Sequence, residues 1–139
     1  MTLVELVIVL AVLAILAAMA WPSLRDAVLK SRRSDAMAAL GEIAQAQERW
    51  RANNPAYQAV LADLPGGRSV SHDGHYALSL ADVNGSNYTA LATVRSGSPQ
   101  VADSRCQVLV LEVRGGNITY RSRAAGDAAN GTPDPCWVR

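Results

Sequence analysis

The sequence predicts an α+β protein in which one long N-terminal helix packs on a four-stranded antiparallel sheet. Three observations predict this fold class. The chain opens on an apolar run that continues into a stretch with helical periodicity, its second half contains short runs of alternating polarity, and turn-forming residues separate those runs. With 139 residues, half of them hydrophobic, the chain can form one domain with a buried core.

The apolar run contains one carboxylate close to its start. Residues 6–24 are all uncharged, and Glu5 immediately precedes them. As a helix, these residues extend about 28 Å, close to the roughly 30 Å hydrocarbon core of a bilayer. No basic residues precede the run and no clear small-residue cleavage site follows it, so we expect a retained membrane-spanning segment and not a signal peptide. We therefore divide the chain into a hydrophobic helix segment, residues 1–24, and a globular head, residues 25–139.

An amphipathic stretch, residues 25–52, continues the same helix. Its apolar side chains recur at mainly helical spacing, and Asn53, Asn54 and Pro55 then provide a stop near Ala52. Pro22 removes a backbone donor and crowds the preceding turn, so we expect a break or bend there. An unbroken helix would be about 75 Å long, and its first half would have to project from the head.

The remaining segments alternate between turns and strands. Residues 53–73 form an αβ-loop, with one helical turn expected around residues 57–61. Residues 74–123 contain four runs rich in Tyr, Val, Leu and Thr, and Gly115-Gly116 is typical of a tight hairpin between the last two. We expect these runs to form an antiparallel meander.

The C-terminal segment, residues 124–139, is rich in turn residues and needs a constraint to stay ordered. Cys106 and Cys136 are the two cysteines of the chain, and they can pair in an oxidising compartment. The bridge would close a loop of about thirty residues, which the chain-entropy treatment equates with a stabilisation of about 3 to 4 kcal/mol. We expect it to hold the tail against the strand that begins at Gln107.

Two groups of basic residues stand out although the net charge is only +1. The run KSRRS, residues 30–34, lies on the amphipathic helix, and Arg114, Arg121 and Arg123 lie on adjacent predicted strands. For KSRRS the default interpretation is a structural role at a membrane exit or a subunit contact, and for the three strand arginines it is a solvated face. The sharper alternatives are phosphate contacts by KSRRS and a basic strip exposed on a filament, and DNA remains a lower-ranked candidate partner.

Neither a catalytic set nor a metal site is evident in the sequence. His72 and His75 lie in a turn-like segment without a clear third ligand, so we assign no metal. No Ser/His/Asp set, paired-carboxylate spacing or glycine-rich phosphate loop stands out. We therefore expect no enzymatic activity and no cofactor.

Glu5 has two interpretations. A carboxylate at a helix start complements the helix dipole. If many such helices were bundled together, the buried carboxylate would need a cation, and the N-terminal amine of a neighbouring chain could provide it. That pairing would set the register between subunits.

The opening stretch, TLVELVIVLAVLAILAAMAWPSLRDAV, resembles the N-terminus of bacterial type IV pilins after processing, with Glu5 and Pro22 in register. The later SRRSDAMAALGEIAQAQERW, the four strand-like runs and a late CW are similar to the small type IVa class. The resemblance implies the pilin fold and a prepilin peptidase cut before Met1, which would become N-methylated. It also implies that Glu5 meets a neighbour's Met1 amine and that the helix loosens between Ala14 and Pro22 in the filament. Pilins more often have Phe at the position of Met1 and Gly at that of Ala14.

The expected function is that of a structural subunit. The chain would wait in the inner membrane with a periplasmic head, and the assembly machinery would then add it to a homo-oligomeric extracellular pilus. Such fibres serve motility, adhesion or DNA uptake. The alternatives are a minor pilin, a type II secretion pseudopilin or, in another class, a single-pass membrane-anchored periplasmic binding protein.

Overall fold

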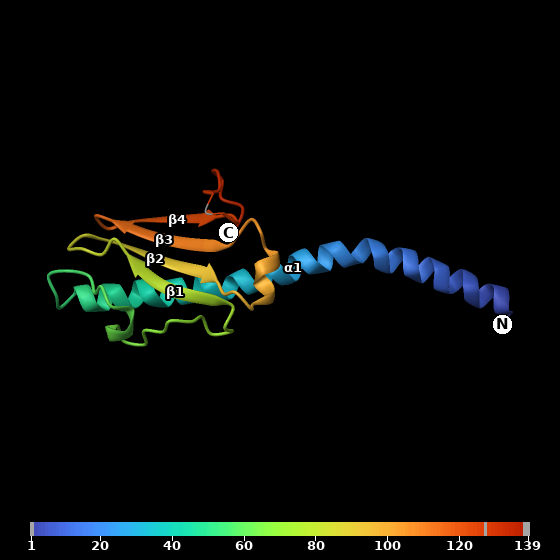
Figure 1. Cartoon of the computed structure of the whole chain (residues 1–139), viewed down its shortest axis with the longest axis horizontal. Coiled ribbons are helices and arrows are strands. Elements are labelled where there is room, and N and C mark those ends of the chain that lie inside the picture. The colour runs from blue at the N-terminus through green and yellow to red at the C-terminus, as the bar shows by residue number, and fades with distance from the viewer. Residues whose placement is uncertain (1, 127, 138–139) are drawn as a thin grey trace.

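A computed structural model describes residues 2–126 and 128–137 of the chain. It has the predicted α+β fold class: one long helix packs on a four-stranded antiparallel sheet whose strand order follows the sequence (Figure 1). The elements are α1 (Leu3–Arg51), η1 (Leu61–Asp63), β1 (Tyr76–Ala81), β2 (Asn87–Val94), η2 (Pro99–Ala102), β3 (Val108–Arg114) and β4 (Asn117–Arg123).

Helix α1 starts and stops where side chains can replace missing backbone hydrogen bonds. At its start, the Thr2 hydroxyl accepts from the Glu5 backbone N at 3.3 Å, as part of a capping box. At its end, the Asn54 side-chain amide donates to the Trp50 carbonyl at 2.8 Å, and Ala52 is the C-cap. The predicted stop near Ala52 is therefore confirmed.

Of the two outcomes expected near Pro22, a break or a bend, the break is absent, because α1 is continuous through position 22. It continues through this position and curves along its first half (Figure 1). A helix can accommodate an internal proline by bending and losing one hydrogen bond, so a full break is not required. The loosening between Ala14 and Pro22 that the pilin resemblance implies concerns the assembled filament and stays a prediction.

The core lies between the second half of α1 and one face of the sheet. Leu40 and Ile43 belong to a buried stripe at helical spacing, and the facing side chains come from alternate residues of β1, β2 and β3. The buried stripe and its sheet partners comprise Ala36, Ala39, Leu40, Ile43, Ala46, Tyr76, Leu78, Tyr88, Ala90, Ala92, Leu109, Leu111 and Val113. The opposite side of the sheet, which we call the outer face, points away from the helix.

The hairpin between β3 and β4 has the turn that the sequence predicts. Gly115 and Gly116 both have positive φ, 53° and 83°, and they join the paired residues Arg114 and Asn117. Glycine adopts these angles without the steric penalty of a side chain. The two-glycine prediction is confirmed.

The αβ-loop differs from its prediction in one respect. Its helical turn is the 3₁₀ turn η1, residues 61–63, and not residues 57–61. The buried Gln47 side chain explains the shift, because it donates to the Gln58 carbonyl at 2.8 Å and accepts from the Gln58 backbone N at 2.9 Å. Both backbone groups of Gln58 are thereby bound to α1 and are unavailable for a local helical turn.

The expected disulfide joins Cys106 and Cys136. We expected it to hold the C-terminal segment along β3. Instead, the segment lies along β4. The Asn130 backbone N donates to the Ser122 carbonyl at 3.0 Å, and the Trp137 indole N donates to the Arg121 carbonyl at 2.7 Å. Cys106 precedes β3, but β4 is the edge strand and its outward backbone groups are the ones open to new partners.

Candidate functional site

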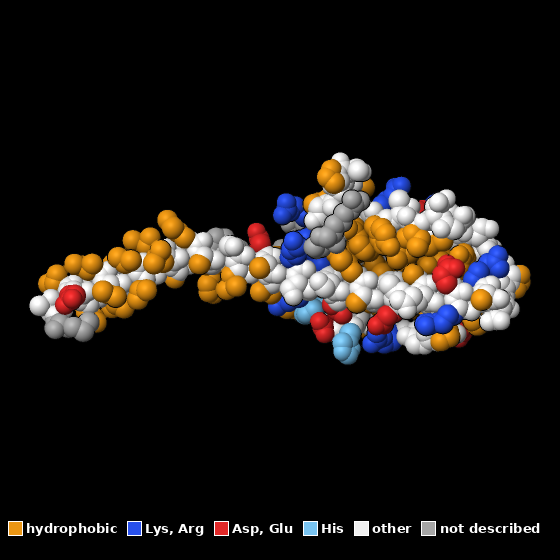
Figure 2. Space-filling view, turned by 180° about the vertical axis from the view of Figure 1, so that it is seen from behind, with side chains coloured by type: hydrophobic (Ala, Val, Ile, Leu, Met, Phe, Trp, Pro, Cys, Tyr) orange, Lys and Arg blue, Asp and Glu red, His pale blue; other side chains and the backbone are white. Residues whose placement is uncertain are grey.

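The first half of α1, residues 3–28, contributes nothing to the core, and we call it the projecting half. Every described side chain in it is exposed, and Figure 2 shows it as an apolar rod that leaves the head. Its most apolar stretch of 18 residues is 0% buried. By length and composition, this helix can cross a membrane. An exposed apolar surface of this size requires lipid or protein around it.

Glu5 lies at the free end of this rod. In the single subunit, its carboxylate accepts from the Thr2 backbone N at 3.4 Å, which is a weak contact. The helix dipole favours a negative charge at this end. Met1 lies outside the described residues, so the predicted contact between Glu5 and a neighbour's Met1, and the methylation of Met1, stay predictions.

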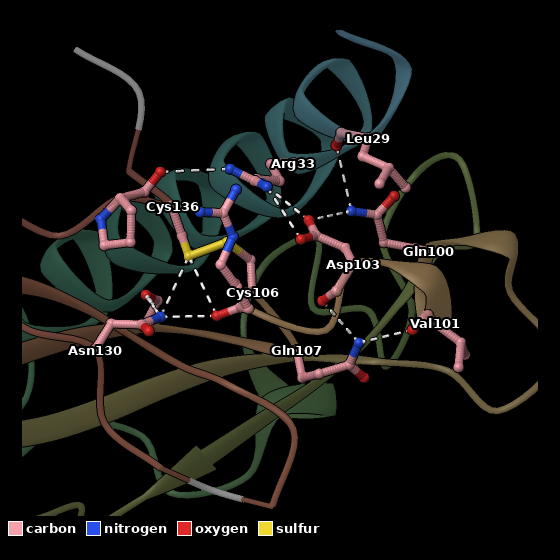
Figure 3. Close-up of polar contacts among 12 residues, drawn as sticks. Leu29, Arg33, Gln100, Val101, Asp103, Cys106, Gln107, Asn130 and Cys136 are labelled. Carbon is pink, nitrogen blue, oxygen red and sulfur yellow. Dashed lines mark hydrogen bonds and ion pairs between the residues drawn. A yellow bond between two sulfur atoms is a disulfide. The ribbon is translucent and has the colours of Figure 1, made fainter. Parts of the chain in front are cut away.

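The KSRRS run is divided between the core and the surface. Arg33 is buried, and its guanidinium donates to both carboxylate oxygens of Asp103, at 2.7 and 3.0 Å (Figure 3). It also donates to the Pro135 carbonyl at 3.4 Å. Lys30 is exposed and Arg32 is half-buried, so the run does not form one surface, and at Arg33 it has the structural role that the default interpretation assigns to it. Arg33 is a structural residue.

A second set of contacts extends this ion pair to η2. The Gln100 side chain donates to Asp103 at 2.9 Å and to the Leu29 carbonyl of α1 at 3.2 Å (Figure 3). The α1 helix, η2 and the tail are therefore tied together at the neck, where the projecting half leaves the head. Sequence reasoning missed this network because its members are seventy residues apart along the chain.

Arg114, Arg121 and Arg123 lie on the outer face of β3 and β4, and we call them the basic strip. Their register places them on one face, as predicted, because Arg121 pairs with Val110, Arg123 pairs with Val108 and Arg114 pairs with Asn117. Glu112 lies among them, forms an ion pair with Arg114 and has an oxygen 3.9 Å from Arg121 Nε. Arg114 and Arg121 are exposed and Arg123 is half-buried, and Glu112 partly neutralises the strip.

The histidines do not form a recognisable site. His75 Nδ1 is 3.0 Å from the Ser98 hydroxyl, which caps η2 by accepting from the Gln100 backbone N. Among the residues that the structure describes, no group of three or more His, Cys, Asp or Glu side chains is placed to hold a metal ion.

A long helix with an exposed apolar half, an antiparallel meander on its other half and a disulfide-tied tail define a type IV pilin. Residues 22–110 match the family described as type IV minor pilin ComP, DNA uptake sequence receptor. The chain therefore belongs to this family of structural proteins. No curated protein matches the chain. The matched residues begin after most of the apolar run, so the head supports the pilin assignment independently of the opening motif.

Proposed function

We propose that this chain is a minor pilin that waits in the inner membrane with its head in the periplasm and then joins a type IV pilus. The observation that carries the proposal is the projecting half, which is apolar on all sides over residues 6–24 and has no buried side chain among those that the structure describes. Lipid and a bundle of like helices both cover such a surface. The helix can therefore pass from the first environment to the second without exposing its apolar side chains to water.

Glu5 would shift the equilibrium of the subunit between the bilayer and the filament. A carboxylate in the centre of a membrane costs about 2.5 to 3.5 kcal/mol, and less near the interface. In a filament, the Met1 amine of a neighbouring subunit would compensate the charge. This pairing would favour the filament over the bilayer for each added subunit.

The family description favours a minor subunit over a major one. We therefore expect a few copies of this chain among many copies of another pilin. Mass spectrometry of sheared surface filaments measures that ratio and also reads the mass of the N-terminal peptide, including methylation of Met1. A fibre composed mainly of this chain would make it the major subunit, and its absence from fibres would favour a secretion pseudopilin or a membrane-anchored binding protein.

DNA binding is a second proposed function, favoured because the matched family is described as a DNA uptake sequence receptor. The net charge of +1 provides no general attraction, so a local basic surface has to supply it. We assign this role to the basic strip. It lies on the face of the sheet opposite α1, and the outer face would remain accessible when α1 helices form the centre of a fibre.

A gel shift with the head, residues 25–139, tests this assignment. The head retains every buried residue, because the first buried position is Leu29. Replacing Arg121 and Arg123 by alanine should weaken binding and flatten its salt dependence, whereas Arg68→Ala, at an exposed arginine near α1, should not. Glu112→Gln should tighten binding because it removes the carboxylate within the strip. No shift at low salt would reject DNA binding by the head.

A further inference from the structure

Two open grooves lie at the neck, and Leu29 of α1 and Ala102 of η2 line both of them. The first, of about 450 Å³, has apolar walls formed by Trp21, Leu24 and Val28. It also carries Arg25 and Arg32. The second groove carries Lys30 and Arg105. We call these four cations, Arg25, Lys30, Arg32 and Arg105, the basic collar.

The basic collar has an excess of positive charge that the head does not neutralise. None of its four side chains forms an ion pair with a residue that the structure describes. Two carboxylates line the same grooves, but Asp103 is bound by Arg33, which leaves Asp26 as the single unpaired one. Figure 2 shows Lys and Arg side chains gathered where the projecting half enters the head. This surface is suited to anions.

The place of the collar relative to the apolar run identifies which anions it meets. Arg25 follows the last residue of the uncharged run, and Arg32 is about 10 Å further along the helix axis. The headgroup region on one side of a bilayer is about 5 to 8 Å thick. Side chains on a helix tilt toward its N-terminus, which is the membrane side here, so Lys30 and Arg32 can reach this layer.

Two apolar side chains at the neck support the same placement. Trp21 is 72% exposed at the end of the span, where tryptophan commonly lies at the membrane interface. Val101, on η2 beside the neck, is 52% exposed. An apolar groove with arginines beside it matches the boundary between acyl chains and phosphates better than it matches a nucleic acid, whose phosphates are accompanied by no aliphatic region.

We propose that the basic collar binds the phosphate groups of anionic phospholipids in the periplasmic leaflet while the subunit waits in the membrane. The apolar walls of the first groove then contact the upper part of the acyl chains. This inference rests on the membrane-anchored state in the proposed function. It adds a lipid-dependent hold on the head, which the subunit has to leave when it enters a fibre.

Vesicle flotation tests the proposal with two proteins, the full chain and a fragment of residues 21–139 that keeps both grooves and the whole core. The vesicles are pure phosphatidylcholine or an equimolar mixture with phosphatidylglycerol. The full chain should float with both. The fragment should float mainly with the anionic vesicles, because each cation near an anionic surface strengthens binding by about fivefold.

Matched charge variants make the test specific. Arg25→Gln with Arg32→Gln should weaken binding of the fragment to anionic vesicles by about 25-fold. Arg49→Gln with Arg68→Gln removes the same charge from a groove at the far end of the head and should change little. Equal effects of the two pairs, or equal binding to both kinds of vesicle, would overturn the proposal.

The remaining outcomes separate this inference from the proposed function. A full chain that does not float would contradict membrane anchoring itself. A full chain that floats beside a fragment that does not would contradict only the collar. If the double variant Arg25→Gln with Arg32→Gln lowered DNA binding in a gel shift and left vesicle binding unchanged, the collar would be a nucleic-acid surface and the lipid assignment would be wrong.

Discussion

The two halves of α1 have the same backbone conformation but opposite surroundings. None of the described side chains of the projecting half is buried, whereas the half that follows contributes a continuous buried stripe to the core. The sequence difference is one of pattern, since the first half is apolar on all sides and the second only along one stripe. One continuous helix can therefore lie in two different environments. Its backbone hydrogen bonds are the same in both, so they do not mark the boundary between them.

The comparison separates the roles of residues in the two regions. The head contains the buried ion pair, the disulfide and the core, so changes there should alter its stability. The projecting half makes no such contacts in the single subunit, so changes there should alter location and assembly. The following predictions test that separation, from the largest expected effect to the smallest.

The largest effect is expected from Glu5→Ala. Incorporation into surface fibres should be lost, because a subunit without the carboxylate has no charge to pair with a neighbour's amine. The free energy of unfolding of the head should stay unchanged. Immunoblots of sheared fibres and of membranes measure how much of the subunit is in each. Asp26→Ala, at an exposed carboxylate further along α1, is the control. Normal fibre incorporation of Glu5→Ala would contradict the assembly role.

The second effect is expected at the neck, from Arg33→Ala. It leaves Asp103 buried without a counter-charge, so the free energy of unfolding of the head should fall by about 3 to 5 kcal/mol. Urea unfolding measures the change. The double replacement Arg33→Met with Asp103→Leu removes both charges and should recover most of the loss. A single variant as stable as the original chain would show that the ion pair contributes little.

The third effect is expected from replacing Cys106 and Cys136 together by serine. The bridge spans a sequence separation of 30 residues, and its loss should lower the free energy of unfolding by about 3 to 4 kcal/mol. Insertion of the apolar helix into membranes should not change. Chemical reduction of the original chain should reproduce the destabilisation. If the free energy of unfolding decreased by less than about 1 kcal/mol, hydrogen bonds along β4 would be sufficient to hold the tail.

The smallest effect at neutral pH is expected from Tyr88→Phe. Burial raises the pKa of the Tyr88 hydroxyl, with a smaller contribution from Glu48, and the hydroxyl has no hydrogen-bond partner among the described residues. Removing it should change the free energy of unfolding at neutral pH by about 1 kcal/mol or less.

The same tyrosine predicts a pH dependence. An unfolded tyrosine ionises near pH 10 while the folded one stays protonated, so the unfolded state binds fewer protons above that pH and the head becomes less stable as the pH rises. Burial also raises the pKa of Tyr76, so Tyr88→Phe should remove only part of this loss. Urea midpoints at about pH 8 and about pH 11 measure it. Tyr120→Phe, at an exposed position, is the control, and an equal effect of the two variants would contradict the role of burial.

Local patterns predicted the elements but not their long-range partners. Helical spacing after residue 24, alternation in the four strand runs and Gly115-Gly116 each predict structure within a short window, and all three are present. The ion pair between Arg33 and Asp103 and the hydrogen bonds between Gln47 and Gln58 depend on the tertiary fold. Arg33 resembled its basic neighbours in composition, and only its position on the buried side of α1 separates it from Lys30 and Arg32.

The candidate sites divide in the same way. Glu5 and Pro22 were recognisable because their spacing in an apolar run is itself a signal. The collar was not, because Arg105 joins Lys30 only when η2 folds against the neck. The close spacing of Trp21, Arg25 and Arg32 after a span is visible in the sequence, but this spacing does not place Pro99 and Ala102 of η2 beside them.

The C-terminal tail also affects how crowded heads behave on a fibre. A free sheet edge can recruit a strand from another chain, and identical or related domains held close together are the most exposed to this reaction. Here the tail pairs with the C-terminal part of β4, and at the opposite edge Val70 bridges to Ala77 of β1. Both edges are thus partly closed to incoming strands. By holding the tail on β4, the disulfide would prevent the sheets of neighbouring heads from pairing edge to edge. The heads would then stay separate from one another along the fibre.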